Sequence, residues 1–363
     1  MKFSAQHDNV LSHLLRITEY LISNLDEETG CLHALYGDWN DALDRLGKTD
    51  DQRREYGTGV SIMTTLQFYR NLGEIGEILK KLGRDKEVER YAAIRKKVQD
   101  GLLKYAVVEN EQGERKIVHG WGDKRSYFVA SYFDNDGKSR DGVTSNAFWI
   151  LSGAIDWDNS MKKDILAAYE RLDSKYGIKT FEPFFSSEND KVGRITRLPK
   201  GTAENGAAYI HATLFAIWSL FEIGEDQKAW EQIYKILPLT HGFISTTPFV
   251  MPNSYVENRD KGMDGESMSD WFTGSGCVLL KIFYFCVFGV KADMDGITIS
   301  PCLYMPFEKM EATLGIKGAT IKLCLKKGDG RRKFIVDDKA CCTDKLRLSN
   351  RDLKGTISVK IEL

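Results

Sequence analysis

The sequence has no surplus of charge of either sign. Its 363 residues include 51 Lys and Arg against 52 Asp and Glu, with neither a basic half nor an acidic tail. Nucleic acids and anionic membranes select for clustered positive charge. We therefore expect neither as a partner, and we expect a substrate that is not a polyanion.

Cysteine pairs at metal-binding or disulfide spacing are also missing. The seven cysteines are scattered, no C-x-x-C pair occurs, and the histidines do not cluster with them. The odd number argues against a disulfide framework, and the spacing predicts no zinc site. A reducing compartment, the cytoplasm, is therefore the expected location.

Long apolar runs are absent as well. The first ten residues are polar, so we expect no ordinary signal peptide. The longest apolar run, at 278–290, contains Lys281 and is too short to span a bilayer. We interpret it as a buried helix.

Neither strand-helix alternation nor a Gly-rich phosphate loop occurs, which disfavours a nucleotide-binding α/β fold. A content of 42% hydrophobic and 28% charged residues is typical of a soluble globular protein. Apolar residues instead recur at helical spacing over most of the first 290 residues. The predicted helical stretches are 9–25, 59–82, 85–107, 144–155, 160–175, 205–223, 227–237 and 269–288.

From residue 296 onward the pattern changes to short alternating strands separated by Gly, Asp and Asn turns. We therefore predict a mainly α protein, with a helical catalytic region at 1–290 and a β-strand region at 291–363. Paired helices whose long loops carry Trp, Asp, Glu, His and Asn indicate an α/α toroid with its active site at one end. The predicted strands are 297–300, 309–314, 319–325, 333–336 and 356–363.

The first loop motif is Asp38-Trp39-Asn40-Asp41, which follows Tyr36 and Gly37. A tryptophan face can stack on a pyranose ring, an Asn amide can bind hydroxyl groups, and an Asp can give a proton to a glycosidic oxygen. The alternative is a helix N-terminus, with Asp38 or Asn40 as the cap and Trp39 in the core. Taken alone, the motif leaves both interpretations open.

Two later motifs predict an anion site. Glu204 and Asn205 precede His211, and Trp271 precedes Thr273 and Gly274. Hydroxyl groups, a histidine and the N–H groups beside a glycine at a helix N-terminus can hold an oxyanion. The alternatives are a helix cap at Glu204 and Asn205, a core histidine, and small residues in a close helix contact.

Taken in order, these motifs resemble those of the inverting glycoside phosphorylases of the cellobiose and chitobiose phosphorylase family, glycoside hydrolase family ninety-four. The matching segments are D-W-N-D at 38–41, E-N-G-x-x-x-x-H at 204–211 and S-D-W-F-T-G-S at 269–275. The resemblance covers most of the chain. It implies an (α/α)6 barrel and phosphorolysis of a β-linked gluco-oligosaccharide to α-glucose 1-phosphate, with inorganic phosphate as co-substrate and no other cofactor.

The resemblance also implies roles for individual residues. The general acid falls on Asp41 and the sugar-stacking tryptophan on Trp39. Phosphate attacks as an anion already, so an acid and an anion site suffice where an inverting hydrolase needs a second carboxylate. The phosphate contacts fall on His211, Thr273 and Gly274, and further substrate contacts are expected at Asp38, Asn40, Glu204, Asn205 and Trp271.

Two departures from the family pattern qualify these expectations. Ala203 stands where the cellobiose-type enzymes carry a basic residue, so we expect an acceptor other than simple glucose, with 245–255 lining that side. Only one helix precedes the acidic loop, and about eight helices are predicted where a closed barrel has six pairs. In the family, arginines that bind sugar and phosphate come from the part of the protein before the acidic loop. No positions of this sequence correspond to them.

The chain therefore resembles the C-terminal part of a phosphorylase. An open toroid exposes apolar helix flanks, which favours a homodimer or a completing N-terminal chain. The alternatives are an inactive remnant, a carbohydrate-binding module, or an inverting hydrolase that uses Glu204 or Asp270 as its base. Release of glucose 1-phosphate only in the presence of phosphate distinguishes the first hypothesis from the others.

Overall fold

The computed structural model describes residues 8–242, 250–269 and 274–363, which form two compact units. The first unit comprises Met1–Asp173, Lys179–Ala207 and Glu257–Met263, and the second comprises Ser174–Ile178, Ala208–Val256 and Asp264–Leu363. The change from helix to strand near residue 290 falls inside the second unit. The division into units therefore does not follow the boundary expected at 290.

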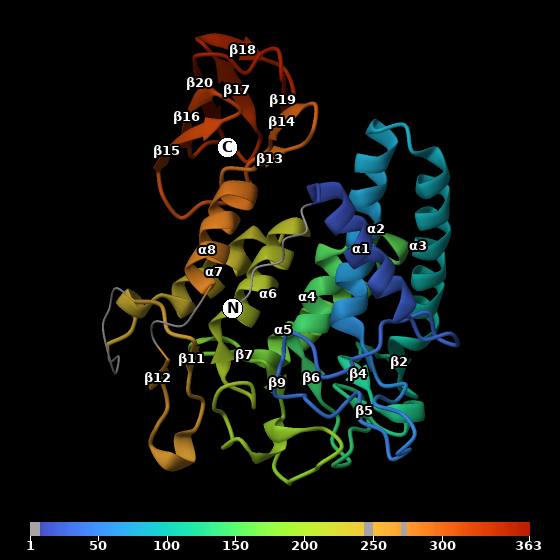
Figure 1. Ribbon diagram of the computed structural model, residues 1–363. Helices are drawn as coiled ribbons and strands as arrows, with labels where there is room; N and C mark the ends of the chain where they lie inside the picture. The colour runs from blue at the N-terminus through green and yellow to red at the C-terminus, as the bar shows by residue number, and fades with distance from the viewer. Residues whose placement is uncertain (1–7, 243–249, 270–273) are drawn as a thin grey trace. The chain divides into compact units, whose positions relative to one another are not determined.

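The first unit is built mainly on two long antiparallel helices, α2 and α3, which pack side by side (Figure 1). α2 begins where the Ser61 hydroxyl accepts a hydrogen bond from the Thr64 N–H and buries one apolar face. α3 carries Asp85 and Glu87 in its first turn, where their negative charges interact favourably with the helix dipole. The helices are α1 Val10–Ser23, α2 Ile62–Lys81, α3 Asp85–Tyr105, α4 Val143–Leu151 and α5 Met161–Leu172.

Short strands tie the loops of this unit together. β1 pairs with β4, and β4 pairs with β5, so the segment before α2 and the segment between α3 and α4 form one small sheet. An apolar cluster that includes Leu43, Leu46, Val129 and Phe181 lies within the loop region. The strands are β1 Val60–Ser61, β2 Val107–Glu109, β3 Arg115–Ile117, β4 Gly120–Trp121, β5 Phe128–Val129, β6 Asp141–Gly142 and β9 Phe181–Glu182.

The second unit begins with helices and short strands. α6 is buried almost all round, whereas α7 is amphipathic, with Asp226 in its first turn. β10, β11 and β12 form a three-stranded antiparallel sheet. The helices are α6 Ile210–Glu222, α7 Asp226–Ile236 and α8 Ser275–Ile282, and α8 continues as a π-helix at Phe283–Val287. The strands are β8 Gly177–Ile178, β10 Ala208–Tyr209, β11 Ser254–Tyr255 and β12 Ser267–Met268. β8 pairs with β7 Asp173–Ser174.

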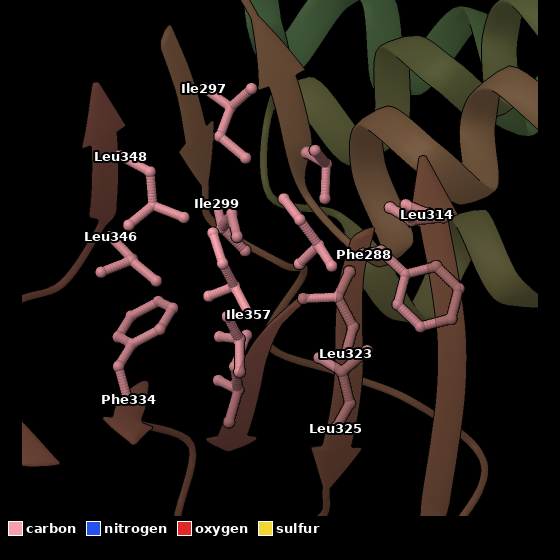
Figure 2. Packing of buried hydrophobic residues seen from close by; sticks show 14 of the residues in the cluster. Phe288, Ile297, Ile299, Leu314, Leu323, Leu325, Phe334, Leu346, Leu348 and Ile357 are labelled. Carbon is pink, nitrogen blue, oxygen red and sulfur yellow. The ribbon is translucent and has the colours of Figure 1, made fainter. Parts of the chain in front are cut away.

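The C-terminal strands form a five-stranded sheet in the order β15-β16-β20-β17-β18 and a three-stranded sheet in the order β13-β14-β19. Along β16, Ile321, Leu323 and Leu325 are buried and alternate with more exposed residues, as expected for a sheet with one face on a core. Figure 2 shows the apolar side chains that fill this core. The strands are β13 Val290–Ala292, β14 Gly296–Ile299, β15 Lys309–Ile316, β16 Ala319–Lys326, β17 Lys333–Val336, β18 Lys339–Cys341, β19 Leu346–Ser349 and β20 Thr356–Glu362.

Each predicted helical stretch contains a helix, and each predicted C-terminal strand contains a strand. A helical body with a C-terminal β region is therefore confirmed. The largest differences are at the starts of two helices. α8 was expected from 269 and begins at Ser275, and α6 was expected from 205 and begins at Ile210, because Ala208 and Tyr209 pair with β11. No helix of the described residues is both long enough and apolar enough to cross a membrane.

Candidate active site

The Asp38-Trp39-Asn40-Asp41 segment lies in the long loop between α1 and α2. No helix begins at this segment, so it does not act as the helix cap that was the alternative interpretation. Asn40 is buried, Trp39 is half-buried, and Asp41 is exposed. The turn therefore presents one carboxylate to solvent.

The Asp38 carboxylate anchors the turn and is itself only 1% exposed. Its Oδ2 accepts hydrogen bonds from Ser61 Oγ at 2.6 Å and from His119 Nε2 at 2.8 Å, and its Oδ1 accepts one from the Asn40 N–H at 2.7 Å. Burial alone would raise the pKa of Asp38, but the His119 imidazole and these donors outweigh burial and lower it. The side chain that was expected to bind substrate thus has its oxygens bound within the protein.

Asn40 continues the turn beneath the surface. Its side-chain Oδ1 accepts a hydrogen bond from the Ala42 N–H at 3.3 Å, and the residue is 2% exposed. An Asn or Asp that bonds the backbone two residues onward stabilises a tight turn. Asp38 and Asn40 do this in succession, and the result is a turn on which Asp41 points outward.

Asp41 forms an ion pair with Arg194 of the first unit, with 2.8 Å between Nη2 and Oδ2. The two side chains are 73% and 53% exposed. Ion pairs as exposed as this one contribute about 0–1 kcal/mol, because water screens them. The pair can therefore open at little cost when another group binds Asp41.

Glu204 is half-buried in the neighbourhood of this pair. Burial raises the pKa of Glu204, the negative charge of Asp41 raises it further, and Arg194 opposes the rise. Glu204 does not cap α6, whose N-cap is Tyr209. A second carboxyl group with a raised pKa therefore accompanies the exposed Asp41.

Asn205 is fully buried, and its amide is used within the protein. Its Oδ1 accepts a hydrogen bond from the Phe185 N–H at 2.7 Å, and its Nδ2 donates to the carbonyl groups of Phe185 and Leu198 at 3.0 and 2.9 Å. Asn205 thus connects three backbone positions around Glu204. This use leaves the amide no free hydrogen-bonding group for a sugar.

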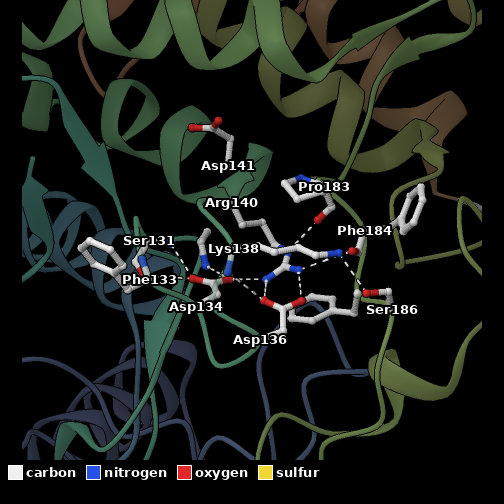
Figure 3. Close-up of polar contacts among 12 residues, drawn as sticks. Ser131, Phe133, Asp134, Asp136, Lys138, Arg140, Asp141, Pro183, Phe184 and Ser186 are labelled. Atoms are coloured by element: carbon white, nitrogen blue, oxygen red, sulfur yellow. Dashed lines mark hydrogen bonds and ion pairs between the residues drawn. The ribbon is translucent and has the colours of Figure 1, made fainter.

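A buried arginine supports the same loop from below. Arg140 is 0% exposed, and its guanidinium donates to Asp134 Oδ2 at 2.6 Å, to Asp136 Oδ2 at 2.7 Å and to the Pro183 carbonyl at 2.6 Å (Figure 3). The same group lies 3.8 Å from the centroid of the Phe185 ring. Arg140 therefore fixes the segment that holds Asn205.

In the second unit, His211 lies in the first turn of α6 and is half-buried. The predicted helix began at 205, so the later start of α6 at Ile210 puts His211 closer to the helix N-terminus than expected. Burial lowers the pKa of His211, so the imidazole is neutral near pH 7. Gly274 is the N-cap of α8, while Trp271 and Thr273 lie outside the described residues.

Three positions that shape this site were not assigned from the sequence: His119, Arg140 and Arg194. His119 stands in a Gly- and Trp-rich stretch outside the predicted helices and strands, where no motif marked it. Arg194 carries no spacing signal, because its partner Asp41 lies on another loop. Arg140 pairs with Asp134 and Asp136 of its own loop, and this local spacing was not used. Among the described residues, no group of three or more His, Cys, Asp or Glu could hold a metal ion.

Residues 1–289 match the catalytic domain of the glycosyl hydrolase 94 superfamily. N,N'-diacetylchitobiose phosphorylase from Vibrio furnissii is 26% identical over 330 residues, covering 90% of this chain and 39% of the relative. Solabiose phosphorylase from Paenibacillus borealis is 26% identical over 367 residues, covering 96% and 44%. The chain thus spans about two fifths of the length of these relatives.

The solved structures add a likeness of fold. A sialidase structure superposes with a TM-score of 0.53 at 12% identity, over 82% of this chain and 26% of that chain. At this identity the likeness concerns the fold alone.

Proposed function

Because the chain belongs to the glycosyl hydrolase 94 superfamily, we propose that it acts in phosphorolysis of a β-glucosidic bond in a gluco-oligosaccharide. The family membership inferred from the three motifs is confirmed by this match. The observation that carries the proposal is the exposed Asp41 carboxylate on a turn in which the Asp38 carboxylate and the Asn40 side-chain oxygen are hydrogen-bonded within the protein. The product is α-glucose 1-phosphate, formed with inversion.

The proposed reaction needs one proton donor and one bound anion. Asp41 donates its proton to the glycosidic oxygen as the bond from that oxygen to the anomeric carbon breaks. A phosphate oxygen forms the new bond to that carbon from the opposite face of the sugar. Phosphate is already an anionic nucleophile, so no second carboxylate is required to remove a proton from water.

The ion pair with Arg194 bears on this role. A carboxylate paired with a guanidinium is ionised, whereas a general acid must carry a proton. On this proposal the substrate separates Arg194 from Asp41 when it binds. The exposure of both side chains makes that separation cheap.

The remaining site residues divide into direct contacts and supports. We assign direct sugar contact to Trp39, Glu204 and Trp271, and phosphate contact to His211, Thr273 and Gly274. Asp38, Asn40 and Asn205 act on substrate only through the backbone that they hold, because their side chains are buried and hydrogen-bonded to other parts of the protein.

The architecture and setting are part of the same proposal. The helices form part of an (α/α)6 barrel at 1–290, followed by the β region at 291–363. The protein works in the cytoplasm without a cofactor.

Phosphate dependence tests the proposal. The full chain is incubated with β-linked gluco-oligosaccharides with and without inorganic phosphate, and glucose 1-phosphate and free glucose are both measured. We expect glucose 1-phosphate only when phosphate is present. Free glucose without phosphate would support an inverting hydrolase instead, and sugar-dependent tryptophan quenching without any product would support a binding module.

His211→Ala tests the anion site. A hydrogen bond to a charged group contributes about 1.5–3 kcal/mol, so the KM for phosphate should rise about tenfold or more. The matched control is His241→Ala, because His241 packs on Tyr176 and bonds the Lys235 carbonyl. An unchanged KM for phosphate in the His211 variant would remove this residue from the proposal.

A further inference from the structure

His119 occupies a rigid position beneath the acidic turn. Its N–H donates to the Val129 carbonyl at 2.9 Å, and its own carbonyl accepts from the Ile62 N–H at 2.9 Å. The ring is 0% exposed and lies edge-on to Phe181, 5.7 Å between centroids. Backbone and ring are therefore both held by neighbouring elements of the first unit.

Both ring nitrogens of His119 have partners. Nε2 lies 2.8 Å from Asp38 Oδ2, and Nδ1 lies 3.1 Å from the Thr144 hydroxyl in α4. A carboxylate only accepts hydrogen bonds, so Nε2 carries the hydrogen and donates a hydrogen bond to Asp38. The imidazole thus connects α4 to the acidic turn through its two nitrogens.

This buried arrangement is expensive to keep for stability alone. A buried carboxylate costs several kcal/mol of solvation, and apolar residues of similar volume often serve stability equally well. Here the buried carboxylate has a second use, because its other oxygen accepts the Asn40 N–H and bends the chain toward Asp41. The orientation of Asp38 therefore decides where Asp41 stands.

We propose that His119 is a positioning residue for Asp41, acting through Asp38 and the turn at 38–41. It holds the carboxylate of Asp38 in the orientation that closes the turn, and it touches no reacting atom. The catalytic part of this inference rests on the proposed role of Asp41 as proton donor, whereas the structural part does not.

Two substitutions at His119 separate its two contacts. In His119→Gln the amide nitrogen reaches about as far as Nε2 and can still donate to Asp38. In His119→Asn the nitrogen reaches only as far as Nδ1, so the bond to Asp38 is lost while a polar contact near Thr144 remains possible. Both remove the ring from Phe181, so packing loss is similar in kind.

Amide hydrogen exchange of the full chain is the first measurement, and it requires no substrate. Peptides covering 38–44 should exchange faster in His119→Asn than in the natural protein, whereas His119→Gln should stay close to it. His33→Asn is the control, since His33 lies 3.4 Å from Asp26 in the same loop and makes no contact with the turn that the described hydrogen bonds include. Equal exchange at 38–44 in both His119 variants and the natural protein would overturn the proposal.

Kinetics are the second measurement. If phosphorolysis is present, His119→Asn should lower kcat on the order of 10- to 100-fold, since small misplacements of a catalytic group have effects of this size. The KM for phosphate should stay nearly constant, and His119→Gln should retain most of the activity. Full kcat in His119→Asn would also overturn the proposal.

Asp38→Asn provides the test if His119→Asn does not fold. It removes the acceptor for one donor while keeping the side-chain volume, and it should accelerate exchange at 38–44 in the same way. Unchanged exchange in that variant would contradict the inference. Faster exchange in a chain that shows no phosphorolysis would support the positioning and reject only the proposed function.

Discussion

Single side chains around Asp41 differ sharply in what they are free to do. The side chains of Asp38, Asn40 and Asn205 are buried and hydrogen-bonded, whereas Asp41 is exposed and forms an ion pair with the exposed Arg194. A buried, fully bonded polar group stabilises a loop, and an exposed carboxyl group is available for chemistry. The proton-transfer role is therefore testable at Asp41 by itself.

Asp41→Asn should lower turnover on the order of 10²- to 10⁴-fold, because the proton donor is lost while hydrogen-bonding shape is kept. Initial rates of glucose 1-phosphate release measure the effect. Asp50→Asn is the matched control, since Asp50 lies on the same loop and pairs with Lys191 near Arg194 in the sequence. A rate equal to that of the natural protein would exclude Asp41 as the acid.

Glu204→Gln should raise the thermal stability of the protein at pH 7. Burial raises the pKa of Glu204 in the folded protein above its pKa in the unfolded chain. Ionisation of Glu204 therefore destabilises the folded state as the pH rises from the unfolded-state pKa to the folded-state pKa, and that loss persists at higher pH. The gain should disappear below the unfolded-state pKa of about 4.3. Thermal melts across pH 4–8 measure it, with the exposed Glu188→Gln as the control.

The loops around the site are held by elements that are far apart in sequence. β1, β4 and β5 place His119 under the acidic turn, and the Ser61 hydroxyl both caps α2 and donates to Asp38. Arg140 joins the loop before β6 to the one after β9. These supports consist of charged and polar groups inside the fold, so removing one partner leaves another uncompensated.

Arg140→Met should therefore destabilise the protein by about 3–5 kcal/mol, since it leaves the buried Asp134 without its cation. Denaturant unfolding monitored by circular dichroism measures the change. Arg197→Met is the comparison, because Arg197 makes only exposed ion pairs with Glu188 and Asp190. A loss below about 1 kcal/mol, as for an exposed pair, would show that Arg140 is not a support.

One face of α1 is apolar and exposed to solvent. Val10, Leu14, Ile17 and Tyr20 of α1 are 76%, 40%, 57% and 59% exposed. They recur at the spacing of one helix face, and exposed apolar patches mark interaction surfaces.

We expect the purified chain to self-associate through this face, and Ile17→Lys to reduce the association. A charge at a position that is apolar and 57% exposed costs nothing in the free chain but is buried in a dimer. Sedimentation velocity over a range of concentrations measures it, with Lys86→Ala on α3 as the control. A monomer at every concentration would contradict the expectation.

Helical and strand periodicity predicted the helices and the strands β14 to β17 and β20, because burial of one face of each element appears in the local pattern. The short strands β1 to β13, and β18 and β19, were not predicted. The family followed from three short motifs. The start of α6 was not predictable, since the pairing of Ala208 with Tyr255 overrides local preference. The burial of Asp38 and Asn205 was not predictable either, and from the sequence alone both residues were candidates for sugar contact.

By itself, the sequence determined the order of the helices and of five C-terminal strands, the residue types in each loop, and membership of a phosphorylase-containing family. Only the tertiary structure decided which of those polar side chains are buried and hydrogen-bonded within the protein, and that the Asp41 carboxyl group is exposed. The reason is physical: a side chain's solvation and partners depend on segments such as His119 and Arg194 that lie far from it along the chain. Local patterns carry no record of those distances.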